Sequence, residues 1–195
     1  ERIDDNHHIY DTEPELLRGF IQYLNEEDPD IIYTFNGDSF DWPYLITRCE
    51  HHHVMPQFGR CGQNIDREPE KKTEAKRPQD LVRAVYLFGR VNLDVYNMTR
   101  FFRKQEDSFK LDHLSRKYLG MSKHPMPYKT IFKAWSDKNG SLAKEVAQYC
   151  VQDTILPILL VDQFKLLINS RAMANVCSVE LQTLIYKGET VKVFS

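Results

Sequence analysis

The chain has 195 residues, a formal net charge of −2 at neutral pH, and 42% hydrophobic against 28% charged residues. These values are typical of a folded domain with one sizeable core and part of a second unit, and they exclude a globally basic nucleic-acid-binding surface. No apolar run approaches the ~20 residues that a membrane-spanning helix needs, and no signal peptide opens the chain.

The four cysteines lack the CxxC spacing of zinc sites, and their pattern suggests no disulfide framework. A reducing compartment is therefore expected. The chain starts at Glu1 without an initiator methionine, so we expect that a segment precedes it. The cysteines are Cys49, Cys61, Cys150 and Cys177.

The first expected element is a helix that begins near Asp11 to Glu15. This stretch combines capping residues, a proline and first-turn acidic residues. Apolar residues then recur at helical spacing, as in a helix with one buried face. They are Leu17, Phe20, Ile21 and Leu24. Asp11 and Glu13 therefore belong to a helix start and not to a buried strand.

The next stretch predicts a strand, a turn and a helix. Asp30 to Phe35 is rich in β-branched and aromatic residues, Asn36-Gly37-Asp38 reads as the turn, and a helix is expected from Trp42 to about His53. Asp41 is thereby placed at a strand-to-helix junction at the edge of a sheet, where open α/β folds bind ligands. The alternative is that Asp38 or Asp41 only caps the helix, because aspartate is a preferred capping residue.

The middle of the chain is less regular. Residues 54–85 are polar and interrupted by glycine and proline, which indicates a loop or hairpin. Two strands are expected at Leu81–Phe88 and Val91–Val95, on either side of a Gly89-Arg90 turn. Asp94 could be an active-site acid, although capping of the following helix is favoured. A short helix at Lys110–Leu119 should stop at Gly120.

A long helical segment is expected from Ser141 to about Asn169. Tyr149 and Asp153 are four residues apart, so they project from one face of this helix. They could form a simple hydrogen-bonded pair, or a water-orienting group beside a metal ligand. Pro157 has no N–H to give to the carbonyl of Asp153, which predicts a kink or a break just beyond Asp153.

Two spaced patterns resemble the second and third exonuclease motifs of family B DNA polymerases, those of the replicative polymerase delta type. These patterns are Asn36-x-x-x-Phe40-Asp41 and Tyr149-x-x-x-Asp153. Other segments resemble the same family in the same order, so that the resemblance covers about residues 11–195. They are Asp28–Ile32, Pro43–Leu45, Gly89–Asp94, Tyr118–Gly120 and Gly188–Val193.

The resemblance implies an α/β fold of the RNase H-like (DnaQ-like) 3′→5′ exonuclease type, a mixed sheet flanked by helices. Its N-terminal strands are expected to be truncated, and with them the first exonuclease motif, which carries two metal-binding carboxylates. Residues 1–170 would form the partial exonuclease domain, and residues 171–195 the connection into the polymerase palm. In similar polymerases a β-hairpin near residues 54–85 helps to separate the primer strand from the template.

The resemblance also implies roles for individual residues. Asp41 and Asp153 would hold two Mg²⁺ (or Mn²⁺) ions, which favour hard oxygen ligands, and Tyr149 would orient the attacking water. A phenol with a pKa near 10 suits hydrogen bonding better than proton abstraction. Asn36 and Phe40 would position a frayed 3′ end, unless they are only a turn residue and a core aromatic. Lys129 would contact the phosphate backbone.

The expected function is therefore proofreading of DNA within a DNA-directed DNA polymerase. Its partners would be DNA and, through regions outside this chain, a sliding clamp and accessory subunits. No membrane association is expected. It would act in a eukaryotic nucleus or in a virus-infected cell. Two alternatives remain, which are a non-catalytic exonuclease-like structural domain and a stand-alone nuclease of the same chemistry that acts on RNA.

Overall fold

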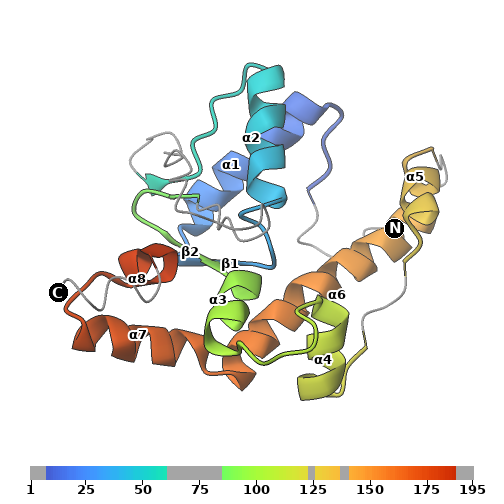
Figure 1. Ribbon diagram of the computed structural model, residues 1–195. Helices are drawn as coiled ribbons and strands as arrows, with labels where there is room; N and C mark the ends of the chain where they lie inside the picture. Colours follow the sequence, from blue (N-terminus) through green and yellow to red (C-terminus); the bar gives the residue numbers. More distant parts are fainter. Residues whose placement is uncertain (1–7, 61–84, 123–125, 137–140, 188–195) are drawn as a thin grey trace, which may run out of the picture.

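The computed structural model describes residues 8–60, 85–122, 126–136 and 141–187 (Figure 1). Most of the expected loop at 54–85 and the Gly188–Val193 segment lie outside these ranges. The helices and strands are α1 (Glu13–Glu27), β1 (Ile31–Thr34), α2 (Asp41–His51), β2 (Val91–Asp94), α3 (Val95–Phe102), α4 (Leu111–Leu119), α5 (Tyr128–Ser136), α6 (Ser141–Gln163), α7 (Leu166–Val176) and α8 (Leu181–Lys187).

A parallel pair of strands, β1 and β2, separates two layers of helices. The register aligns Ile31 with Val91 and Thr34 with Asp94, so both strands end at the same edge. In Figure 1 the pair α1 and α2 lies on one side of the strands, and α3, α6 and α7 lie on the other. Successive β1 side chains point to opposite faces, because the side-chain period of a strand is two.

Each face of β1 joins its own hydrophobic core. Ile32 packs with buried side chains of α1 and α2, including Leu24 and Trp42. Tyr33 packs on the opposite face with buried residues of β2, α3, α4, α6 and α7. This arrangement of a parallel sheet between helices agrees with the expected α/β class.

The first helix forms as predicted. Thr12 accepts a hydrogen bond from the backbone N–H of Glu15, whose carboxylate accepts one in return from the N–H of Thr12. Glu13, the first helical residue, instead reaches Arg48 on α2, whose Nε and Nη2 donate to its two carboxylate oxygens at 2.6 and 2.5 Å. Hydrogen bonding to Arg48, and then to His52, lowers the pKa of Glu13 to about 2. This carboxylate therefore ties α1 to α2.

The expected strand Leu81–Phe88 falls partly outside the described residues, because 81–84 are not among them. Its described part contains an isolated bridge between Leu87 and Arg90. The expected break at Pro157 is wrong, since α6 runs through this residue to its end at Gln163. The interruption comes at Lys165, whose left-handed backbone (φ 53°) separates α6 from α7. One proline removes one helical hydrogen bond, and the packing of Leu156 and Leu160 in the core outweighs it.

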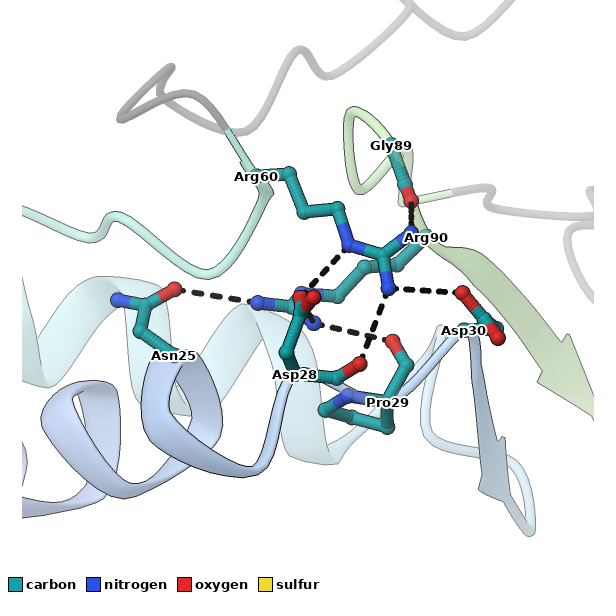
Figure 2. A network of polar contacts seen from close by, with 7 residues as sticks. All are labelled: Asn25, Asp28, Pro29, Asp30, Arg60, Gly89 and Arg90. Atoms are coloured by element: carbon teal, nitrogen blue, oxygen red, sulfur yellow. Dashed lines mark hydrogen bonds and ion pairs between the residues drawn. The ribbon is translucent and has the colours of Figure 1, made fainter.

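Two arginines, Arg60 and Arg90, form hydrogen bonds with the loop before β1 (Figure 2). Arg90 is buried, and its Nη1 donates to Asp28 Oδ1 at 2.8 Å and to the Pro29 carbonyl at 3.0 Å. Arg60 donates to Asp28 Oδ1 and to Asp30 Oδ1, both at 2.7 Å. Arg60 Nη1 also donates to the carbonyl of Gly89 at 2.9 Å. We call these residues, Asp28, Asp30, Arg60 and Arg90, the arginine clamp.

The remaining expectations concern α4, α7 and membrane association. Gly120 adopts a left-handed conformation (φ 66°) at the end of α4, as predicted. The expected division at residue 170 falls inside α7. No helix in the described ranges has the length and apolar character needed to cross a membrane.

Candidate active site

The candidate site begins with the turn that joins β1 to α2. Asn36 takes a left-handed conformation (φ 64°), which asparagine tolerates better than most residues. Gly37 is buried, and a Cβ at this position would lie 2.5 Å from Thr34 Cβ. The turn therefore requires a residue without a side chain at position 37, directly before the residues that carry the proposed chemistry.

Asp41 is the first residue of α2 and lies at the protein surface. Partial desolvation by its surroundings raises the pKa of its carboxyl. The helix has Phe40 at its N-cap position and no side-chain hydrogen bond there, so neither Asp38 nor Asp41 serves as the cap. The N-cap position is therefore excluded for both residues, although the Asp41 carboxylate accepts a hydrogen bond from its own backbone N–H in the first turn of α2.

Aromatic side chains lie on the exposed side of the same turn. Phe40 is 68% exposed and Tyr44, one helical turn further, is 64% exposed. The alternative that Phe40 is a core aromatic is therefore wrong. An exposed aromatic ring beside a carboxylate at a helix start offers a surface on which a nucleotide base could stack.

The second part of the candidate site lies on α6. Tyr149, Asp153, Leu156 and Leu160 are spaced by four, three and four residues, so they share one helical face. Leu156 and Leu160 are fully buried in the same core as the partly buried β1 residues Tyr33 and Phe35. Asp153 is partly buried, and its Oδ1 atom is shielded from solvent. The structure thus brings α6 against β1, the strand that leads into the Asp41 turn.

Lys129 lies neither in the Asp41 turn nor on α6. It is exposed on α5, a helix that packs against α6. Figure 1 shows α5 beside the N-terminal end of α6. A phosphate backbone that runs along α6 could reach this side chain.

Three buried polar residues under the turn were not predicted as a group. Asp94 accepts hydrogen bonds from the N–H groups of Asn36 and Asp38, at 2.8 and 3.2 Å. Asn92 is fully buried, and its Nδ2 donates to Asp38 Oδ1 at 2.7 Å. Asn92 Oδ1 accepts from Trp42 Nε1 at 3.1 Å. We call Asp38, Asn92 and Asp94 the buried polar cluster.

The two carboxylates of this cluster sit in different environments. Asp94 also caps α3, where it accepts from the N–H groups of Tyr96 and Asn97, so the predicted capping role is confirmed. Burial raises the pKa of Asp94 against the effect of these donors. Burial, and then the neighbouring Asp94 charge, raise the pKa of Asp38 to about 7. One sequence signal could have revealed the cluster, since the polar residues Asn92 and Asp94 alternate with Val91 and Leu93 in β2.

The donors at the candidate site suit a hard cation. Carboxylates such as those of Asp41 and Asp153 are the ligands that Mg²⁺ and Mn²⁺ prefer. Within the described ranges, however, no three or more His, Cys, Asp or Glu side chains come together as a metal-binding group. The described residues therefore fit part of a metal site, which further oxygen ligands would have to complete.

Comparison with known proteins identifies the family. The model of the DNA polymerase family B exonuclease domain matches residues 2–114, more than half of the chain. The chain belongs to the family B DNA polymerases. The match includes β1, the Asp41 turn and the buried polar cluster, and it ends before α6.

Similar DNA polymerases extend the match over α6. A DNA polymerase of Red sea bream iridovirus is 31% identical over 95% of this chain and 19% of its own length. The DNA polymerase delta catalytic subunit of Bos taurus is 30% identical over 95% of this chain and 17% of its own length. The chain therefore spans about a fifth of the polymerases to which it is similar.

A solved structure supports the fold. The family B DNA polymerase of the archaeon Pyrobaculum calidifontis superimposes with a TM-score of 0.71 and 23% sequence identity. The superposition covers 91% of this chain and 22% of that polymerase. The RNase H-like α/β class expected from the family B resemblance is thus confirmed.

Proposed function

We propose that this chain is the proofreading part of a DNA-directed DNA polymerase and removes mispaired nucleotides from a DNA 3′ end. The observation that carries the proposal is the position of Asp41. Its carboxylate is exposed at the first turn of α2, at the end of a strand whose other face packs on the helix of Asp153. Two exposed aromatic rings flank it.

In this proposal each candidate residue has its own role. Asp41 and Asp153 hold divalent cations, and the Tyr149 hydroxyl orients the attacking water. Phe40 stacks on the terminal base, Asn36 shapes the turn beside it, and Lys129 binds the phosphate backbone. When bound, two Mg²⁺ or Mn²⁺ ions would stabilise the attacking and the leaving oxygen atoms.

The wider setting follows from the similar polymerases. The substrate is DNA, and the incorporation activity resides in parts of the polymerase beyond this chain. A sliding clamp and accessory subunits would bind those parts. The site of action would be a eukaryotic nucleus or a virus-infected cell.

The test uses the full-length polymerase. Asp41→Asn or Asp153→Asn should reduce Mg²⁺-dependent 3′→5′ hydrolysis by about 10³-fold, because each removes a charged ligand from the cation site. Nucleotide incorporation should stay unchanged. The matched controls are Glu50→Gln on α2 and Asp162→Asn on α6, exposed carboxylates on the same helices, which should retain hydrolysis.

Retained hydrolysis in either aspartate variant would contradict the metal assignment. Two further outcomes would favour the alternative functions. A wild-type polymerase without any 3′→5′ hydrolysis would identify a structural version of the domain, and a preference for RNA 3′ ends over DNA would identify a ribonuclease.

A further inference from the structure

The residues on either side of Asp41 converge on one buried side chain. Asp38 precedes Asp41 by three residues, and its carboxylate accepts from Asn92 Nδ2 at 2.7 Å. Trp42 follows Asp41 directly, and its Nε1 donates to Asn92 Oδ1 at 3.1 Å. A single amide thus holds both flanks of the exposed carboxylate.

The chemistry of the partners fixes the orientation of this amide. Indole N–H is only a donor, so Asn92 must present its oxygen to Trp42, which leaves its NH₂ to donate to the Asp38 carboxyl oxygen. Asn92 is fully buried, and Trp42 and Asp38 are 3% and 2% exposed, so water cannot replace the lost bonds. Asn92 also lies in β2, where Ile32 of β1 is its register partner.

We propose that Asn92 is a positioning residue for hydrolysis, which sets the direction of the Asp41 carboxylate without touching the substrate. The inference rests on the proposed function. Asp94 supports the same turn from below through the N–H groups of Asn36 and Asp38. β2 thus supplies the fixed support, and the turn after β1 and the start of α2 carry the residues that Asn92 positions. A displacement of about 1 Å in a catalytic group can lower a rate ~10²-fold.

The first test is Asn92→Leu in the full-length polymerase, measured as kcat and KM for hydrolysis of a DNA 3′ end, with nucleotide incorporation as an internal control. We expect kcat to fall 10- to 100-fold, incorporation to stay unchanged, and the Mg²⁺ concentration for half-maximal rate to rise. The matched control is Ile46→Ala, which removes buried apolar volume from the same core layer without touching the amide. Its kcat should stay within twofold of wild type.

The second test exchanges the donor and the acceptor of the hydrogen bond between Asn92 and Asp38. In Asp38→Asn combined with Asn92→Asp, the amide at position 38 can donate to the carboxylate at position 92, which can still accept from Trp42. We expect this pair to recover at least tenfold of the kcat lost in Asn92→Asp alone. Trp42→Phe, which removes the Nε1 donor and part of the buried ring volume, should lower kcat three- to tenfold.

Each outcome decides the inference. Wild-type kcat in both Asn92→Leu and Trp42→Phe would overturn it, as would an equal kcat loss in Ile46→Ala or a double variant no better than Asn92→Asp. Asp41→Asn is measured beside them. If Asp41→Asn retains hydrolysis, the proposed function fails. If Asp41→Asn abolishes hydrolysis while Asn92→Leu and Trp42→Phe keep the wild-type kcat, only the positioning role fails.

Discussion

Asp38 and Asp94 are buried carboxylates with unequal support. Asp94 receives four backbone N–H groups, whereas Asp38 receives one backbone hydrogen bond, from Val85, and the side-chain amides of Asn92 and Asn97. The turn and the helix start hold backbone donors in place, but side-chain amides can rotate away. Asp38 consequently bears more of the cost of burial, and its pKa rises to about 7 while it remains part of the buried polar cluster.

Asp38 should make the stability of the protein depend on pH. Its pKa is about 7 when folded and 3.8 in the reference state, so the folded protein binds the proton more tightly. Stability is then fully present below about pH 4 and declines as pH rises to 7, by up to about 4 kcal/mol. Relative to wild type, Asp38→Asn should gain stability between pH 4 and 7 and show no further change above 7.

Thermal unfolding of wild type and Asp38→Asn at several pH values between 4 and 8 measures this difference. Asp112→Asn, on the partly exposed surface of α4, serves as the control. A difference between Asp38→Asn and wild type that is constant with pH would contradict the assignment of the proton to Asp38.

Glycine at position 37 should matter for both stability and hydrolysis. Gly37→Ala places a Cβ within 2.6 Å of Thr34 Oγ1, which requires the turn to shift. We expect the free energy of unfolding to fall by about 1–3 kcal/mol, as at other overpacked sites, and the hydrolysis rate to fall as well. Gly120→Ala, with φ at 66° and open space around it, provides the control. Its free energy of unfolding should fall by about 1 kcal/mol, measured by denaturant unfolding. Its hydrolysis rate, measured by digestion of single-stranded DNA, should stay unchanged.

Helices with clear end signals could be predicted from the sequence. Thr12 and Pro14 mark the start of α1, and Gly120 marks the end of α4. The junction between α6 and α7 could not, because Lys165 is an unusual residue for a left-handed conformation and Pro157 gave a stronger but misleading signal. Candidate site residues Asp41 and Asp153 followed from motif spacing. Asn92 did not, since its role depends on contacts between residues 50 or more positions apart.

Relief of backbone strain should stabilise the α6–α7 junction. Lys165 is exposed and has φ 53° and ψ 37°, a conformation that costs most residues ~1 kcal/mol more than glycine. Lys165→Gly should therefore raise the free energy of unfolding by about 0.5 kcal/mol after the loss of chain entropy. Urea unfolding, with Lys165→Ala as the comparison, measures the gain. Equal stability of the glycine and alanine variants would argue against strain.

At the scale of the whole molecule, the arginine clamp joins segments that are distant in the sequence. Arg60 and Arg90 both bind Asp28, at the junction between α1 and β1 (Figure 2). Hydrogen bonds to Arg60, and to a smaller extent Arg90, lower the pKa of Asp28. The clamp therefore persists in weakly acidic solution and keeps the start of β1 in register with β2.

The two arginines should respond differently to substitution and to salt. The Arg90 side chain is 1% exposed and that of Arg60 is 31% exposed. Arg90→Met should thus lower stability more than Arg60→Met, because the hydrogen bonds that it removes come from a guanidinium group shielded from water. Raising NaCl from 0.1 to about 1 M should shrink the effect of Arg60→Met and leave that of Arg90→Met nearly unchanged. Thermal unfolding of both variants at each salt concentration tests this order, and the reverse order would contradict it.

The clamp and the Asp41 turn lie at opposite ends of the two strands. Asp28, Asp30 and Arg90 precede Ile31 and Val91, where the strands begin, whereas the turn follows Thr34, where β1 ends. The N–H of Arg60 also donates to the carbonyl of Phe88 at 2.7 Å, which holds these two described segments side by side at the clamp end. Clamp variants should therefore separate the stability of the domain from the geometry around the Asp41 carboxylate, because they act at the far end of the sheet.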